Sequence, residues 1–214
     1  MTSTKFLSLK IFSFIASAFI VNLSLSCKNK KADPPPTIIY KTDPNAKNSG
    51  GAKKAPIINI TDTILKKQII LYMKDSAASS ERIGIKLGNI YGNVLADVIK
   101  QNKLKRTGSR MVWYKTSGAP FLFEAGIPVD KKPAKLPKKV FVKNIGGDSA
   151  VIAHFYGPYS LTFQGYEALR DWLKSRKKRT SGPPYEVYIG EAIDSKGKAV
   201  DPYLVQTDII FPHH

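Results

Sequence analysis

The stretch PPYEVY (residues 183–188) places one carboxylate, Glu186, among aromatic residues in a run that is typical of a β-strand. Successive side chains of a strand point to opposite faces of the sheet. Tyr185 and Val187 are the natural core pair, because large apolar side chains are usually buried. The alternation therefore predicts that Glu186 and Tyr188 share the other face.

An earlier passage repeats the spacing of this stretch. Gly108 precedes Tyr114 by six residues, just as Gly182 precedes Tyr188 by six. This alignment places Val112 at the position of the glutamate. Val112 and Tyr114 should then face the same way as the glutamate and its tyrosine.

The strands that follow these two passages also end alike. Glu124 lies four residues before Pro128, and Asp208 lies four residues before Pro212. Self-similarity at a fixed spacing indicates an internal repeat. We interpret the chain as a duplicated strand–helix–strand–strand unit.

The rest of the pattern supplies the elements of both units. Apolar residues at helical spacing between Ile83 and Val98, and again between Tyr166 and Leu173, predict two amphipathic helices. Strands are expected at residues 67–73, 110–115, 120–129, 139–145, 149–156, 183–190 and 204–212. These elements predict an α+β fold with a pseudo-twofold antiparallel sheet and two helices covering one side. The uncovered faces of the strands would form a ligand cleft.

Four segments together resemble the GyrI-like (gyrase-inhibitor-like) domain, which also serves as the effector-binding half of AraC- and MerR-type regulators. They read FLFEAGIPV, VIAHFYGPYSLTFQGYEALRDWL, GPPYEVYIGEA and TDIIFP. The resemblance covers residues 62–212 and implies the duplicated α+β fold with a ligand cleft between its halves. It also implies that Glu186, on the Pro-x-Glu-x-Tyr strand, pairs with cationic and often aromatic small molecules.

Some proteins of this family are hydrolases of strained electrophiles that use this glutamate with a tyrosine. The resemblance leaves Tyr114 and Tyr188 as candidates for that tyrosine. Three hypotheses therefore stay open. They are a small-molecule-binding domain that uses Glu186, Tyr188, Tyr114 and Val112, a hydrolase, and a structural lipoprotein in which Glu186 pairs with a surface lysine.

The first 27 residues are typical of an export signal. Lys5 and Lys10 precede an apolar run from Ile11 to Leu25, and the chain's one cysteine, Cys27, follows. A cysteine at that boundary resembles the lipidation site of a bacterial lipoprotein, with an uncleaved anchor or a plain secretory cut as alternatives. We expect a lipid-anchored protein of the cell envelope that faces the periplasm or the exterior, with membrane lipid as a partner.

Residues 28–61 are rich in Lys, Pro, Gly and Asn and predict a disordered basic tether. The formal net charge of +18 favours contact with anionic surfaces, yet the lysines are spread along the chain. No nucleic-acid-binding motif accompanies them, so we expect no nucleic-acid partner.

The chain offers few residues for metal or cofactor chemistry. One cysteine excludes a disulfide framework, and three histidines make a zinc site a poor hypothesis. We expect no metal and no cofactor. His213 and His214 are interpreted as a frayed end.

Overall fold

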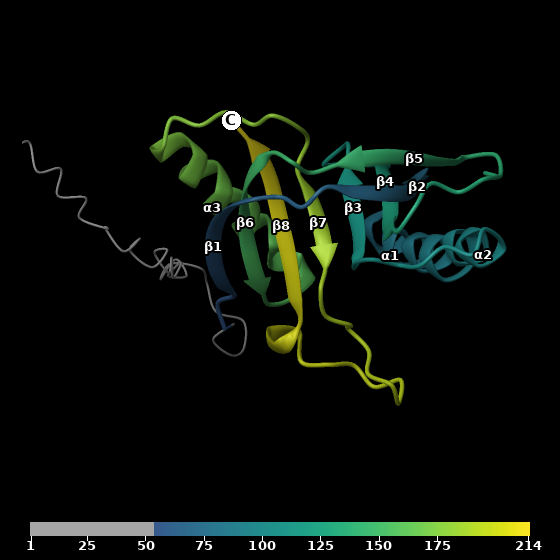
Figure 1. Cartoon of the computed structure of the whole chain (residues 1–214). Coiled ribbons are helices and arrows are strands. Elements are labelled where there is room, and N and C mark those ends of the chain that lie inside the picture. Colours follow the sequence, from purple (N-terminus) through teal and green to yellow (C-terminus); the bar gives the residue numbers. More distant parts are fainter. Residues whose placement is uncertain (1–53) are drawn as a thin grey trace, which may run out of the picture. The chain divides into compact units, whose positions relative to one another are not determined.

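Eight strands form one antiparallel sheet in residues 54–214, the part of the chain that the computed structural model describes (Figure 1). The predicted signal peptide and residues 28–53 of the predicted tether lie outside the described residues. The strands are β1 Ile57–Ile64, β2 Gln68–Ala77, β3 Arg110–Tyr114, β4 Phe121–Val129, β5 Val140–Ile145, β6 Ser149–Tyr156, β7 Tyr185–Tyr188 and β8 Gln206–His213. Their order in the sheet is β1-β6-β8-β7-β3-β4-β2-β5.

The helices fall between the second and third strands of each half. In the first half, α1 (Ser80–Asn89) continues through a π-helical turn (Ile90–Val94) into α2 (Leu95–Gln101). In the second half, a 3₁₀ turn (Tyr159–Leu161) leads into α3 (Thr162–Ser175), and a further 3₁₀ turn (Pro202–Leu204) precedes β8. No helix in residues 54–214 is long and apolar enough to cross a membrane.

The strand order confirms the duplication. Strands β1 to β4 of the first half correspond to β5 to β8 of the second half. When each strand is replaced by its counterpart, the order is the same read from the other end of the sheet. The pseudo-twofold axis therefore passes between β3 and β7. Val112 lies directly opposite Glu186 there. Trp113 opposite Glu124 matches Val187 opposite Asp208, which is the predicted alignment. The α+β fold with pseudo-twofold sheet is thus confirmed.

The sheet begins before the predicted boundary at residue 62. β1 starts at Ile57 and pairs with β6 along its whole length, while Ile58 and Ile60 are buried. Residues 57–61 are therefore a strand, where a tether was expected. The alternation of Ile58 and Ile60 with Asn59 and Thr61 is the signal for this strand, although so short a run does not stand out from the composition of the tether.

The prediction of a frayed end is wrong for His213. Its ring is buried, its Nε2 lies 2.9 Å from Oδ1 of Asp62, and it packs 5.5 Å from the ring of Trp172. The last strand holds this residue because β8 pairs with β6 as far as position 213.

The helices and the predicted groove share one face of the sheet. Ala125, Val112, Glu186 and Ile209 are successive cross-strand partners and therefore point the same way. Ala125 packs under α1 and α2, and Ile209 packs under α3. The expectation of a groove on the face without helices is wrong, because Glu186 and its cross-strand neighbours lie on the face that carries the helices.

A separate hydrophobic core covers the opposite face of the central strands. Trp113, Tyr185 and Val187 pack there with side chains such as Leu65 and Ile145 from the two crossings between the halves. In Figure 1 the chain passes from β1 to β2 and from β5 back to β6 across the central strands. A Cβ at Gly146 (φ +85°) would lie 2.2 Å from the Lys66 carbonyl oxygen, so this crossing requires glycine.

Lys143 anchors the edge strand β5 to this face. Its Nζ lies 2.8 Å from Oε2 of Glu124, 3.3 Å from the ring centroid of Trp113 and 4.7 Å from that of Tyr72. Lys115 approaches the same carboxylate at 3.6 Å from a more exposed position. A half-buried ammonium with a carboxylate and two aromatic faces is a strong local interaction.

Replacing Lys143 by methionine should lower the free energy of unfolding by about 1–3 kcal/mol, because the cation–π contacts and the main partner of Glu124 are lost together. Urea unfolding measures this change. Lys115→Met is the matched control and should change stability by about 0–1 kcal/mol, as exposed pairs do. Equal effects of both substitutions would contradict the anchoring role of Lys143.

Candidate functional site

The centre of the helix-bearing face holds a buried carboxylate. Glu186 is 2% exposed on β7, and two tyrosines of the second half donate hydrogen bonds to it. The Tyr159 hydroxyl lies 2.9 Å from Oε2, and the Tyr166 hydroxyl lies 3.0 Å from Oε1. Tyr159 belongs to the 3₁₀ turn that follows Gly157-Pro158, and Tyr166 lies on the first turns of α3.

The predicted tyrosines extend this cluster towards the first half. The hydroxyl oxygens of Tyr114 and Tyr159 lie 2.9 Å apart, and those of Tyr114 and Tyr188 lie 3.3 Å apart. The structure therefore brings Tyr114, Tyr188 and Glu186 together as the alternation predicted. We call these three residues with Tyr159 and Tyr166 the tyrosine–glutamate cluster.

Burial controls the ionisation of the cluster. It raises the pKa of Glu186, and the hydroxyls that donate to the carboxylate oppose this shift without cancelling it. Burial, with the charge of Glu186, also raises the pKa of Tyr114 to about 12. The pKa values of Tyr159, Tyr166 and Tyr188 rise for the same two reasons. The tyrosines are thus neutral hydrogen-bond donors at physiological pH.

Glu186 has no cationic partner among the described residues. The ion pairs found in residues 54–214 involve other carboxylates, namely Asp75, Glu191, Glu124, Asp208 and Asp62. A buried carboxylate is ordinarily paired with a cation or a metal. No group of three or more His, Cys, Asp or Glu side chains that could hold a metal ion occurs in this part of the chain.

A cleft of about 930 Å³ opens above the cluster, between α1 and the second half. Its walls are mainly apolar and include Ile83, Leu87, Ile193, Val200 and Val205. Tyr114, Tyr159 and Tyr188 line it, and Glu186 lies behind them rather than at its surface. Val112, the fourth predicted ligand-binding residue, is fully buried in the core under α1 and does not line the cleft.

An ion pair connects the first half to the loop that forms one wall of the cleft. Arg110, which lies over the ring of Tyr91 at 5.7 Å, pairs with the exposed Glu191 of the loop after β7. Tyr91 in turn donates a hydrogen bond of 2.6 Å to the Met111 carbonyl from the π-helical turn. Π-helical turns inside α-helices are frequent at functional sites. Arg110 and Glu191 were not predicted as cleft residues, because their proximity depends on how the loop after β7 folds back.

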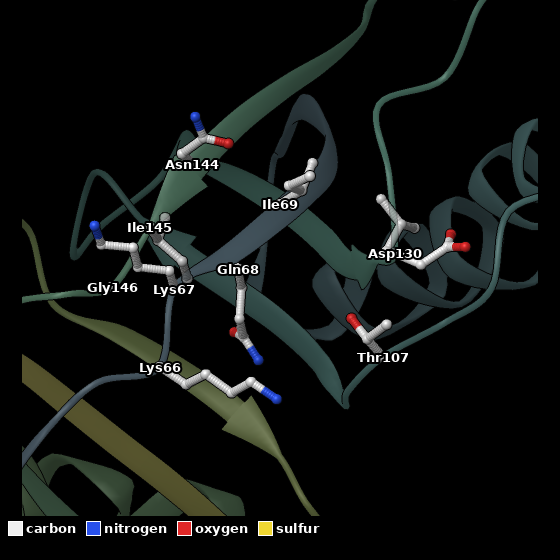
Figure 2. Close-up of a pocket in the computed structure, with 10 residues that line it drawn as sticks. Lys66, Lys67, Gln68, Ile69, Thr107, Asp130, Asn144, Ile145 and Gly146 are labelled. Atoms are coloured by element: carbon white, nitrogen blue, oxygen red, sulfur yellow. The ribbon is translucent and has the colours of Figure 1, made fainter.

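Figure 2 shows a second pocket, of about 570 Å³, at the start of β2 and the end of β5. Polar side chains such as Lys66, Gln68 and Thr107 line it, and its charged residues Lys66, Lys67 and Asp130 are exposed. This second pocket contains no buried titratable group, so the tyrosine–glutamate cluster is the better candidate for a functional site.

Comparison with known proteins gives matches in structure alone. No protein-family model and no curated protein matches the chain. The crystal structure of the EcmrR C-terminal domain is 18% identical, with a TM-score of 0.60, over 74% of this chain and 98% of that one. An uncharacterised conserved protein from Listeria innocua is 12% identical, with a TM-score of 0.51, over 72% of this chain and 92% of that one.

EcmrR bound to DNA in a cryo-EM structure is 19% identical over 74% of this chain, with a TM-score of 0.59, and this chain spans 57% of its length. At these identities the likeness concerns the fold. Together with the strand order, it confirms that the described domain has the GyrI-like fold that the sequence motifs predicted.

The raised pKa of Glu186 predicts a pH-dependent effect of Glu186→Gln on stability. Because the pKa of Glu186 is higher in the folded state than its ordinary value of 4.5, the folded state binds this proton more tightly than the unfolded state does. The resulting stabilisation is fully present below pH 4.5 and is lost as the pH rises through the raised pKa of the folded state. The glutamine variant should therefore melt at a higher temperature than wild type at pH 7.5, and the difference should vanish near pH 4. Thermal unfolding by circular dichroism at both pH values measures this.

Glu81→Gln removes an exposed carboxylate at the edge of the same cleft and serves as the control. The pKa of Glu81 is lowered by hydrogen bonds from Ser79, its own backbone and Ser80, so this variant should show no gain in melting temperature at pH 7.5. If Glu186→Gln melts below wild type at pH 7.5, the ionised carboxylate of Glu186 does not destabilise the fold and the raised pKa is contradicted.

Proposed function

We propose that this domain binds a small amphipathic cation in the cleft between its halves, with Glu186 as the counter-charge. The observation that carries the proposal is a buried carboxylate held by two tyrosine hydroxyls, without a cationic partner among residues 54–214, beneath an apolar cleft. A ligand cation would supply the missing charge.

The energetics of the free site favour such a ligand. Burying a carboxylate without a counter-ion is unfavourable, and the raised pKa of Glu186 reflects this. A cation next to the cluster would stabilise the ionised form. The ring faces of Tyr114, Tyr159 and Tyr188 would add cation–π attraction, while the apolar walls would cover the rest of the ligand.

Tyr159 lies between the cleft and the carboxylate of Glu186, so the cation would reach the carboxylate by displacing this side chain. It is 50% exposed, although its hydroxyl reaches inward to Glu186. It also stands on a short 3₁₀ turn next to Gly157, which lines the cleft as well. A small rotation of this side chain would bring a bound cation next to the carboxylate without rearranging the sheet.

The two alternative functions find less support in the geometry. A structural role for Glu186 would need a lysine beside it, and none forms an ion pair with it in the part of the chain described. A hydrolase would use Glu186 as a general base with a tyrosine, yet the raised pKa values keep the tyrosines protonated and poor nucleophiles.

Glu186→Gln should weaken the binding of a hydrophobic cationic dye at pH 7.5 by at least tenfold, about 1.4 kcal/mol, because the counter-charge is removed while the shape is kept. Fluorescence titration with wild type and variant measures the change. Glu81→Gln removes the same charge from the exposed edge and should change affinity by less than about threefold. Equal affinity of wild type and Glu186→Gln would sink the proposal, and turnover of an electrophilic substrate by wild type alone would favour the hydrolase.

We further propose that lipid on Cys27 holds the chain at a bacterial membrane in the cell envelope. The support is the sequence of residues 1–27, with its two early lysines, apolar run and terminal cysteine. Cells that express the full chain should incorporate radioactive fatty acid into it, and Cys27→Ala should abolish the label. Equal labelling of both forms would rule out lipidation at this cysteine.

A further inference from the structure

The wall of the cleft that α1 contributes has no side chains at two positions. Gly84 and Gly88 lie one helical turn apart and line the cleft. A Cβ added at either position would meet nothing within 4 Å, so no close contact in the fold requires glycine there. Glycine is among the least favourable residues inside a helix. These two residues therefore reduce helix stability without a packing reason in the domain.

The second half contributes two tyrosine rings to the cleft, beside aliphatic side chains such as Ile193, Val200 and Val205. The ring centroids of Tyr159 and Tyr188 lie 6.4 Å apart, and both rings line the cleft above the buried carboxylate of Glu186. The cleft thus combines two helix positions without side chains, two tyrosine rings and one buried carboxylate behind them. A ligand that contacts all three needs a flat face, a π-system and a positive charge.

We propose that the cleft selects planar aromatic cations and that Gly84 and Gly88 make this selection; the inference rests on the proposed function. Without Cβ atoms at these two positions, the ring face of a planar ligand can lie directly on the helix backbone there. Dispersion contacts of this kind lose a quarter to a half of their energy over a gap of about 0.5–1 Å. A tetrahedral cation would reach the same surface with one of its rings and gain little from it.

The test compares alanine variants of three glycines. Gly84→Ala and Gly88→Ala each place one methyl group on the proposed contact surface. Gly92→Ala is the matched control, because Gly92 also has nothing within 4 Å of an added Cβ but does not line the cleft. The probes are proflavine, a planar tricyclic cation, followed by fluorescence, and tetraphenylphosphonium, a tetrahedral cation, followed by calorimetry.

Wild type should bind proflavine more tightly than tetraphenylphosphonium. Gly84→Ala and Gly88→Ala should each weaken proflavine binding by about tenfold, the effect of one misplaced methyl group in a fitted site. Both should change tetraphenylphosphonium binding by less than about threefold. Both variants should also melt at a higher temperature than wild type, so a loss of binding cannot be attributed to unfolding. Gly92→Ala should bind both probes as wild type does.

The outcomes separate this inference from the proposed function. If proflavine binds with dependence on Glu186 but equally to wild type and both glycine variants, the selection by Gly84 and Gly88 is refuted and the cationic site stands. If the variants lose both probes equally, the selection for planarity is refuted. If wild type binds neither probe, both the proposed function and this inference fall.

Discussion

The site depends on one constraint, which is that Glu186 is buried at the pseudo-twofold axis of the sheet. A duplicated sheet places the same residue of both halves face to face at its axis, here position 112 opposite position 186. Two glutamates in these positions would repel each other directly across the strands. Val112 avoids this repulsion and keeps the first-half core closed, so a single carboxylate can occupy the centre of the sheet.

The two halves then contribute different parts to one site. The second half supplies the carboxylate and the hydroxyls of Tyr159 and Tyr166 that hold it. The first half supplies α1, with Gly84 and Gly88 beside apolar side chains, and Arg110, whose ion pair with Glu191 connects the first half to the loop wall. Both halves of the duplicated fold line the cleft. Their side chains differ, and it is this difference, such as Glu186 opposite Val112, that places a single negative charge beneath the cleft.

Much of this arrangement could be predicted from local patterns. Alternation in PPYEVY places Glu186 and Tyr188 on one face, and the glycine-to-tyrosine spacing aligns Val112 with Glu186, its cross-strand partner in the fold. Alternation distinguishes two faces but does not say which one the helices cover, and for this reason the groove was expected on the wrong side. Tyr159 and Tyr166 were missed because their hydroxyls reach Glu186 through the docking of α3, a long-range effect that no strand pattern encodes.

Glu186 is buried and has no cationic partner among residues 54–214, and under the proposed function a bound cation would ionise it. Infrared difference spectroscopy of the ¹³C-glutamate-labelled domain, with and without proflavine, observes this directly when Glu186→Gln identifies the band. At a pH where Glu186 is protonated in the free site, the cation should convert the protonated carbonyl band of Glu186 into carboxylate bands. A Glu186 signal that is identical with and without bound proflavine would contradict it.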